Sequence, residues 1–331
     1  MYIDVHAHLI PQAFWTATDG GGEWYRASQR ERAGRRYIVT RDRLAGPQEP
    51  LWRASLPERL AVMDRQGVGM QLLSSPPYFF NYHLPADEAE AAARELNDEI
   101  ALAMREAPGR IGGLATVPLQ DAARAVSELE RAMALGFVGA ALGTHVDGRD
   151  YDDPALFPFF EAAERLGALL FFHPHAPATQ ASGRGGSYYL ENFVGFPLDS
   201  TIAIASLIFG GVLDRLPSLK LVFAHAGGYA CFAIGRWDHG FGVRGEPHAH
   251  IARPPRDYLE LLYVDTITHD YPALRYVVET MGAGHVVLGS DFPYDMGYES
   301  PVEWLRGAPG LSSDDRELIL GETLSGLIGL R

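Results

Sequence analysis

Hydrophobic and polar residues follow two repeating patterns along most of the chain. From residue 68 onward, short apolar runs of strand length are followed by longer segments with apolar residues at helical spacing, and this succession recurs. The chain opens on a further strand-length segment, in which the apolar residues Ile3, Val5 and Ala7 alternate with polar ones. The pattern predicts strands at residues 1–8, 68–75, 111–118, 137–144, 167–174, 219–226, 262–267 and 285–291.

The segments between these strands predict helices. The first begins at Leu56, after a capping-type serine and with a proline in its first turn, and ends near Gly67. Eight strands, each trailed by a helix, favour a closed barrel over an open sheet divided into two domains. We therefore expect residues 1–331 to form one α/β domain, a (β/α)8 TIM barrel. The other predicted helices are 86–107, 121–135, 154–166, 198–214, 229–240, 271–281 and 313–328.

A long insertion, residues 9–54, follows the first strand and shows no sustained period. It is rich in glycine, arginine and aromatic residues, as in 19–24 and 30–36. A structureless connection of this length inside a compact domain is usually functional. We expect the insertion to be a lid-like segment without regular structure.

Composition limits the classes of partner. The chain has 331 residues, of which 47% are hydrophobic and 21% charged, so a sizeable core is available. The formal net charge of -14 would repel a nucleic-acid backbone and an anionic membrane, and neither is an expected partner. The longest apolar stretch, residues 201–213, is shorter than the roughly 20 residues of a membrane span and predicts a buried helix.

Cysteine content and the first residues bear on the compartment. Cys231 is the only cysteine, so the chain has no intrachain disulfide. The chain opens on a strand and lacks the basic and apolar regions of a signal peptide. We expect a cytoplasmic protein.

The first strand carries the first chemical signal, His6-Ala-His8. Residues two apart in a strand point to one face, so both imidazoles can bind one divalent ion. A pair of surface histidines is the alternative, because short motifs match by chance. In a TIM barrel the C-terminal strand ends meet at one mouth, where active sites lie. Strands five, six and eight end there in His173, His225 and Asp291.

Each of these strand-end residues alone fits a hydrogen-bonded polar side chain. Together, four strands that end in ligand-type residues at the same depth predict a metal site. Three histidine nitrogens and one carboxylate oxygen suit a zinc or manganese ion with one position open for water.

Several motifs resemble the amidohydrolase superfamily. They are the His-x-His pair, the strand-five and strand-six histidines, and Gly289-Ser-Asp-Phe-Pro293. Within that superfamily the chain resembles the branch of aminocarboxymuconate-semialdehyde and γ-resorcylate-type decarboxylases, also at residues 117–121, 224–228, 235–238 and 253–258. The likeness covers nearly the whole chain.

The resemblance implies roles for the strand-end residues. His6, His8, His173 and Asp291 would hold the ion, with Zn2+ preferred and Mn2+ the second choice, and His225 would act as acid/base. Asp291 is a second candidate for moving the proton. No lysine ends strand four, where binuclear relatives carry a carboxylated one, so the resemblance implies one metal ion per chain.

The substrate pocket departs from the resembled enzymes. His175 stands where the aminocarboxymuconate enzyme has a tryptophan after Pro, and Tyr189 and Phe193 stand where tryptophans are expected. We expect these three residues and Tyr294 to contact a small carboxylate substrate. His175 has two other interpretations, as a further metal ligand or as a residue that stabilises its loop. Arg43 and Arg53 are the candidates for binding the substrate carboxylate.

Arg236 lies in Gly235-Arg-Trp-Asp238, a segment that in the resembled decarboxylases places an arginine in the neighbouring subunit's active site. The resemblance therefore implies a homodimer with Arg236 as a catalytic residue in trans, and residues 198–214 could supply apolar contact. A structural ion pair with Asp238 or another nearby acid is the alternative.

The expected reaction is non-oxidative decarboxylation of an aromatic or conjugated, muconate-type carboxylic acid. His225 or Asp291 would deliver the proton to the carbon that loses carbon dioxide. Hydrolysis of an ester, lactone or amide by metal-bound hydroxide is the alternative, since the same groups serve it. A catalytically silent barrel with a binding role is the third possibility, and the complete ligand set argues against it.

Overall fold

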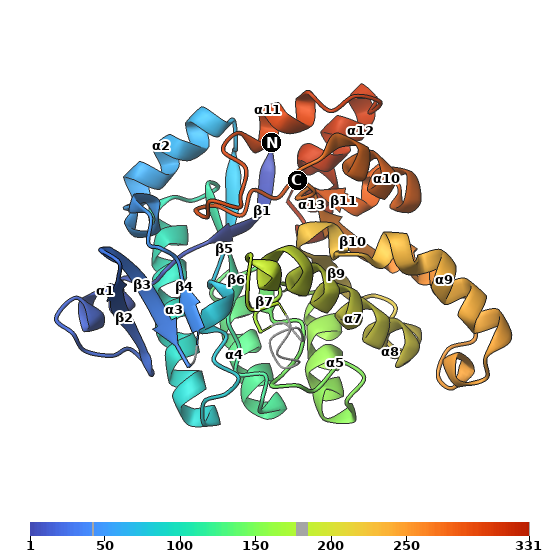
Figure 1. The fold of residues 1–331 in the computed structure, drawn as a ribbon, viewed down its shortest axis with the longest axis horizontal. Coiled ribbons are helices and arrows are strands. Elements are labelled where there is room, and N and C mark those ends of the chain that lie inside the picture. The colour runs from blue at the N-terminus through green and yellow to red at the C-terminus, as the bar shows by residue number, and fades with distance from the viewer. Residues whose placement is uncertain (42, 177–184, 331) are drawn as a thin grey trace.

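Eight parallel strands form a barrel surrounded by helices in the computed structural model, which describes residues 1–41, 43–176 and 185–330 (Figure 1). The predicted (β/α)8 barrel is thereby confirmed. The strands follow one another around the barrel in chain order. They are β1 (Ile3–His8), β5 (Met70–Ser74), β6 (Ile111–Ala115), β7 (Gly139–Leu142), β8 (Leu169–Phe172), β9 (Lys220–Phe223), β10 (Leu262–Asp265) and β11 (Val286–Val287).

The barrel closes between its first and last strands. The backbone N–H of Val5 donates to the carbonyl of Leu288 at 2.9 Å, and the N–H of Asp291 donates to the carbonyl of His6 at 2.8 Å. One rung further, the N–H of His8 donates to the carbonyl of Phe292 at 2.7 Å. Closure therefore places the β1 histidines beside Asp291 at the barrel mouth.

Most helices that surround the barrel begin and end near the predicted positions, but the helix Pro301–Arg306 was not predicted. The helix α2 starts with a capping box between Ser55 and Glu58 and ends at Gly67, whose φ of 72° is left-handed. The predicted helix 198–214 divides in two at Gly211 (φ 71°). The helices after the insertion are α2 (Leu56–Gln66), α3 (Ala86–Glu106), α4 (Ala122–Ala134), α5 (Phe157–Leu166), α7 (Phe196–Phe209), α8 (Val212–Arg215), α9 (Ala230–Val243), α10 (Tyr271–Met281), α11 (Pro301–Arg306), α12 (Ser313–Glu317) and α13 (Thr323–Ile328).

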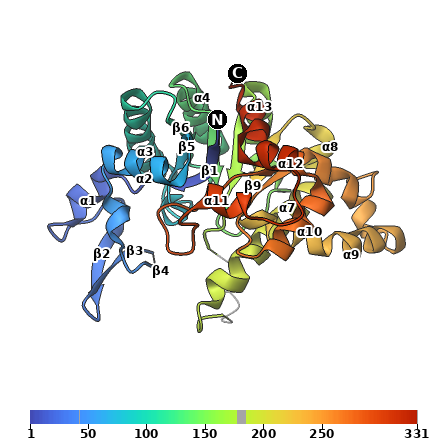
Figure 2. The ribbon, with the colours of Figure 1, turned by 90° about the horizontal axis from the view of Figure 1, so that it is seen from above.

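The insertion has regular structure, so the expectation of a structureless segment is wrong. It contains the helix α1 (Gln12–Thr18) and an antiparallel sheet of β2 (Ala27–Arg32), β3 (Arg35–Thr40) and β4 (Arg43–Ala45). These elements are short, and the distal ends of β2 and β3 are exposed, so no long apolar period marks them. Figure 2 shows the sheet projecting from the same side of the barrel as the segment that leads into α7.

One described helical segment, Glu191–Phe209, is long and apolar enough to cross a membrane by length and composition. The core helix of a globular protein passes the same test. Within this segment Ile204, Leu207 and Ile208 are buried against the barrel. The predicted buried helix is therefore confirmed for these residues, although Ile202 is 37% exposed.

Candidate metal centre and active site

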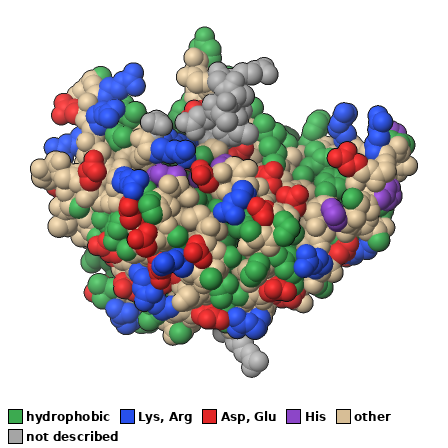
Figure 3. Space-filling view, turned by 90° about the horizontal axis from the view of Figure 1, so that it is seen from below, with side chains coloured by type: hydrophobic (Ala, Val, Ile, Leu, Met, Phe, Trp, Pro, Cys, Tyr) green, Lys and Arg blue, Asp and Glu red, His purple; other side chains and the backbone are tan. Residues whose placement is uncertain are grey.

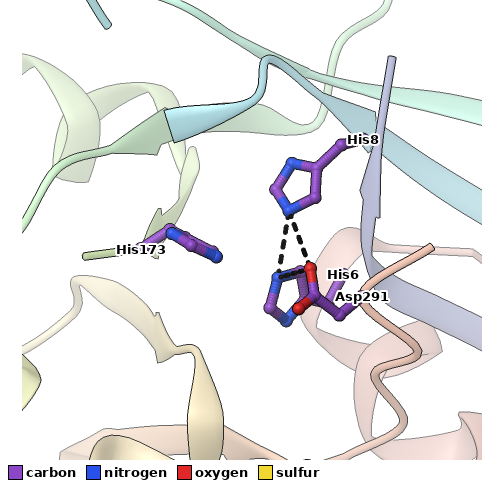
Figure 4. A group of neighbouring side chains, drawn as sticks. All are labelled: His6, His8, His173 and Asp291. Atoms are coloured by element: carbon purple, nitrogen blue, oxygen red, sulfur yellow. Dashed lines mark hydrogen bonds and ion pairs between the residues drawn. The ribbon is translucent and has the colours of Figure 1, made fainter. Parts of the chain in front are cut away.

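Four buried side chains converge at the barrel mouth. His6 and His8 project from β1, His173 follows β8, and Asp291 lies in the loop after β11. Their potential ligand atoms all lie within 4.8 Å of one another, as Figure 4 shows. The structure therefore brings together the four residues for which a metal-binding role was expected.

The three histidines share one hydrogen-bonding arrangement. In each, Nδ1 lies within hydrogen-bond distance of a carbonyl or carboxylate oxygen, and such oxygens only accept. Nδ1 must then carry the hydrogen, which leaves the Nε2 lone pair free. The acceptors are Asp265 Oδ2 for His6 (2.7 Å), the Ser75 carbonyl for His8 (3.1 Å) and the Pro174 carbonyl for His173 (2.7 Å).

The atoms that face one another in this cluster are all acceptors. Nε2 of His6 lies 3.1 Å from Nε2 of His8, and Asp291 Oδ1 lies 3.2 Å and 3.3 Å from these two nitrogens. Asp291 Oδ1 is buried and has no hydrogen-bond partner. Acceptors packed this closely repel one another unless a proton or a metal ion lies between them, and imidazole nitrogen with carboxylate oxygen is a donor set for divalent transition metals. The residues present fit a divalent metal ion.

The pKa values of the cluster reflect the same crowding. Burial lowers the pKa of His6, but the carboxylates of Asp291 and Asp265 raise it to about 10. Burial lowers the pKa of His173 well below its usual range, and the neighbouring histidines lower it further. Burial raises the pKa of Asp291, yet the histidines around it hold that pKa well below its usual value. In the absence of a metal ion, a proton on His6 neutralises this carboxylate.

The first residue of the Gly289-Ser-Asp291 motif is glycine for a steric reason. A Cβ at Gly289 would lie 2.9 Å from Cβ of Asp265 and 3.1 Å from Cβ of His6, so any larger residue would displace the metal-binding strand. Two residues further on, Asp291 has a φ of 59°, and His225 has a φ of 54°. Non-glycine residues in this left-handed region are strained, and such strain is concentrated at functional sites.

His225 lies beside the four-residue cluster and outside it. Its Nε2 atom is 3.9 Å from Asp291 Oδ2, and 16% of its side chain is exposed to the mouth. It sits in the turn His225–Gly227, beyond the end of β9, whereas the sequence pattern predicted strand as far as residue 226. The position leaves this imidazole free to exchange protons with a molecule in the mouth.

A cavity of about 140 Å³ opens over the cluster. The insertion closes one side of it. Trp52 of the insertion, which is 6% exposed, packs edge-on against Tyr294, with ring centroids 5.2 Å apart. The side chains around the cavity that bear on chemistry are Arg43, Glu49, Trp52, Tyr78, His173, Tyr189, His225, Asp291, Tyr294 and Asp295.

Only one of the two candidate arginines reaches this cavity. Arg43, on β4, lines it, and its guanidinium lies 5.1 Å from the centre of the Phe196 ring. Burial lowers the pKa of Arg43, and Glu191 is the acid that most opposes this shift. Arg53 does not line the cavity.

Arg53 holds the insertion together instead. It forms a two-pronged ion pair with Asp19, at 2.6 and 2.8 Å, and lies 3.9 Å above the ring of Trp15. The expectation that Arg53 could bind the substrate carboxylate is corrected, because its guanidinium is already occupied within the insertion.

Of the other expected pocket residues, some line the cavity and others do not. Tyr189 and Tyr294 line the cavity, and Phe193 lines a neighbouring apolar cavity. His175 lies outside both, with its ring centroid 4.5 Å from that of His145, and it does not belong to the metal cluster. A Cβ at Gly143 would lie 2.5 Å from His175 Nδ1, so this glycine makes room for the ring behind the mouth. Its expected contact with the substrate stays a prediction.

Sequence reasoning missed Asp265, Trp52 and Tyr78. Asp265 was detectable as a charged residue at the end of an apolar strand, Leu262-Tyr-Val-Asp. Trp52 and Tyr78 lie in short 3-10 turns, Pro50–Arg53 and Pro77–Phe79, which leave no periodic signal.

Known proteins resemble this chain in sequence. Residues 3–323 match the amidohydrolase family. The chain belongs to this family. The amidohydrolase is 34% identical to the 2-amino-3-carboxymuconate-6-semialdehyde decarboxylase of Dictyostelium discoideum, over 99% of this chain and 91% of that protein. The resemblance inferred from the sequence motifs is thereby confirmed.

Solved structures share the fold of this amidohydrolase. The 5-carboxyvanillate decarboxylase LigW of Sphingomonas paucimobilis superposes with a TM-score of 0.84 at 25% identity, covering 100% of this chain and 99% of that chain. A dihydroxybenzoic acid decarboxylase of Polaromonas sp. JS666, solved with bound manganese and 2-nitroresorcinol, has a TM-score of 0.78 at 22% identity and covers 99% and 97% of the two chains.

Arg236 of the amidohydrolase lies on the exposed side of α9. The expected alternative was an ion pair with Asp238 or another nearby acid. Among the residues that the structure describes, Asp238 pairs with Arg256 at 3.1 Å and accepts from its backbone N–H, and no acid pairs with Arg236. Phe232 on the same helix is 83% exposed. Arg236 and an apolar side chain therefore share one outward-facing helix.

Proposed function

We propose that this amidohydrolase is a metal-dependent, non-oxidative decarboxylase of an aromatic or conjugated, muconate-type carboxylic acid. The observation that carries the proposal is the cluster of three Nε2 atoms and the Asp291 carboxylate at the floor of a cavity lined by Arg43 and His225. The 34% identity to a decarboxylase along almost the whole chain supports this chemistry over hydrolysis.

We propose one divalent ion per chain, held by His6, His8, His173 and Asp291. Zn2+ is our first choice because imidazole nitrogen suits it, and Mn2+ is the second because the carboxylate oxygen suits that ion. The bound manganese of the Polaromonas relative supports the second choice. When bound, the ion would supply Lewis acidity and a fixed point for the oxygens of the substrate.

Side chains of the protein would bind the substrate, exclude water and deliver the proton. Arg43 would bind the carboxylate or a neighbouring oxygen, since guanidinium matches a carboxylate in shape and charge. Tyr189 and Tyr294 would contact the organic part of the substrate, and Trp52 would exclude water from it. His225, 3.9 Å from Asp291, would deliver a proton to the carbon that loses carbon dioxide, with Asp291 as the alternative donor.

The decisive experiment measures carbon dioxide release from a panel of hydroxybenzoates and muconate-type acids, together with the metal content of the purified protein. We expect about one zinc or manganese ion per chain and release of carbon dioxide with at least one panel member. A chain that takes up no metal after metal-supplemented expression would remove the site assignment. Turnover of esters, lactones or amides without carbon dioxide would establish the hydrolase alternative.

We further propose that residues 1–331 work as one domain with residues 9–54 as its lid, and that the chain forms a homodimer in which Arg236 reaches the partner's mouth. The exposed Phe232 and Ile202 support an apolar contact between copies.

The proposed partner is a small carboxylate substrate, and we propose that the protein binds neither nucleic acid nor membrane. The proposed location is the cytoplasm. Acidic and basic side chains are interspersed on the face in Figure 3, which offers no continuous basic stripe to nucleic acid.

A further inference from the structure

A chain of buried polar side chains runs behind the metal cluster and has no part in the proposed reaction. It consists of Arg59 on α2, Gln71 on β5, Asp4 on β1 and Ser290 beside Asp291. Arg59 is 3% exposed and the other three are fully buried. Burial of a charged side chain is costly, so a buried cation and a buried anion in one network call for a reason.

The four side chains form a continuous hydrogen-bonded relay. Arg59 Nη1 donates to Gln71 Oε1 at 3.1 Å, and Gln71 Nε2 donates to Asp4 Oδ2 at 3.0 Å. Ser290 Oγ donates to the same Asp4 oxygen at 2.5 Å. The Gln71 amide therefore joins a cation to an anion, with its oxygen facing Arg59 and its nitrogen facing Asp4.

The relay also binds the backbone of the metal-binding segments. Arg59 Nη2 donates to the carbonyl of His8 at 2.7 Å. Asp4 Oδ1 accepts the backbone N–H of His6 at 3.0 Å and that of Ser290 at 2.9 Å. Three of the four metal-binding residues, His6, His8 and Asp291, are thus fixed directly or through an adjacent residue.

An irregularity in β1 explains why the Asp4 side chain binds the backbone N–H of His6. Asp4 is in register with Gln71 of β5, but the register shifts before Ala7 pairs with Leu73. At such an irregularity the ladder between two strands is interrupted, and backbone groups lose their regular partners. Within the irregular stretch the carboxylate of Asp4 accepts the backbone N–H of His6. Arg59 donates to the carbonyl of His8, where β1 is again in register with Ser74 of β5.

We propose that Arg59 is a positioning residue for the metal site, which holds His8 directly and holds His6 and the Asp291 segment through Gln71 and Asp4. The proposal rests on the metal site of the proposed function and not on the reaction. It predicts that loss of Arg59 weakens metal binding although Arg59 is not a ligand.

Arginine suits this position better than lysine. One guanidinium donates through two nitrogens to two acceptors in a fixed planar geometry, which a single ammonium does not reproduce. The guanidinium also lies 4.6 Å from the centre of the Phe292 ring, which supports it from one side. Burial lowers the pKa of Arg59 to about 10, so the side chain stays cationic at neutral pH.

The test is the dissociation constant for Zn2+ and for Mn2+, measured by competition with a chromophoric chelator. The variants are Arg59→Met, Arg59→Lys and Gln71→Met. Arg110→Met is the matched control, since Arg110 also joins a backbone carbonyl (Gly69, 2.7 Å) to a polar side chain (Asp64, 2.6 Å), at the opposite end of β5. We expect metal affinity to fall roughly 10- to 100-fold in Arg59→Met and Gln71→Met, less in Arg59→Lys, and about 3-fold at most in the control.

A second measurement separates positioning from general stability. The rise in melting temperature on adding metal should shrink in the Arg59 variants and stay as in the wild type in Arg110→Met. Wild-type metal affinity in folded Arg59→Lys and Gln71→Met would overturn the proposal, and these two variants decide it if Arg59→Met does not fold. A wild-type chain that binds no metal would instead overturn the proposed function.

Discussion

Asp265 accepts the Nδ1 hydrogen of His6 at 2.7 Å, and with its other carboxylate oxygen it accepts the backbone N–H groups of Ala226 and Ile267 at 2.9 and 3.0 Å. One buried carboxylate therefore connects a metal-binding histidine on β1 to the turn that carries His225. The hydrogen bond to His6 also fixes which imidazole nitrogen faces the metal.

Asp265→Asn should weaken metal binding with little change in the shape of the site. The amide oxygen can still accept from Ala226 and Ile267, but the amide nitrogen would face His6 Nδ1 and donate to it. His6 would then carry its hydrogen on Nε2 and no longer offer a lone pair to the ion. We expect a roughly 10- to 100-fold loss of metal affinity, measured by chelator competition.

Asp270→Asn is the control for this prediction. Asp270 caps α10 by accepting the N–H of Ala273 at 3.0 Å, and asparagine caps helices equally well. Its metal affinity should match the wild type. Equal affinity in Asp265→Asn and Asp270→Asn would show that Asp265 does not set the tautomer of His6.

His225→Ala and His173→Ala should have different effects, because His173 belongs to the four-donor cluster and His225 lies outside it. His225→Ala should keep its metal and lose activity by roughly 10²- to 10⁴-fold, the usual contribution of a general acid or base. His173→Ala should lose the metal as well. Elemental analysis and carbon dioxide release read these two effects separately.

Two outcomes would contradict this division of roles. If His225→Ala loses its ion as readily as His173→Ala, then His225 is a ligand. If His225→Ala retains near-normal turnover, another group, with Asp291 the first candidate, delivers the proton.

The sequence predicted the barrel and its four converging donors because both leave local signals. Apolar strands repeat at regular intervals, and the donors lie near strand ends, with His6 and His8 at the end of β1 and His173 directly after β8. Strand ends were less accurate. The pattern extended β9 to residue 226, whereas the strand ends at Phe223 and the chain turns at His225 through a left-handed φ. Such turns direct side chains into the barrel mouth, and the pattern of hydrophobic residues does not predict them.

The residues that sequence reasoning missed or misplaced depend on long-range packing. Arg53 and Arg43 looked alike in the sequence, and only folding of the insertion places one against Asp19 and the other over the cavity. Arg59 carried no signal, because α2 has an ordinary amphipathic pattern. Its role depends on contacts with Gln71 on β5 and the carbonyl of His8 on β1, which only the folded barrel brings beside α2.

Arg43→Met should raise KM for the carboxylate substrate roughly 10- to 100-fold, because a charge-assisted hydrogen bond is lost from a partly desolvated site. Metal content should not change, since Arg43 lies outside the donor cluster. Arg41→Met is the matched control: Arg41 lies two residues away in the same insertion and pairs with Asp147 on the surface at 3.2 Å. Equal KM values for the two variants would exclude Arg43 as the carboxylate-binding group.

The last prediction concerns donation of Arg236 in trans, which mixed dimers can test. Arg236→Ala and His225→Ala should each be nearly inactive alone. After subunit exchange, a mixed dimer holds one intact site, with His225 from one chain and Arg236 from the other. Random exchange makes half of all dimers mixed, so activity should return to about a quarter of the wild type.

The control for subunit exchange is the double variant His225→Ala/Arg236→Ala mixed with His225→Ala, a pair that can form no site with His225. This mixture should stay inactive while native mass spectrometry confirms heterodimers. Recovery is expected in the first mixture because a carboxylate approaching a chain of net charge -14 is repelled, and an arginine from the partner would offset that repulsion at the mouth. Heterodimers without recovered activity would exclude donation in trans and leave Arg236 as a surface residue of α9.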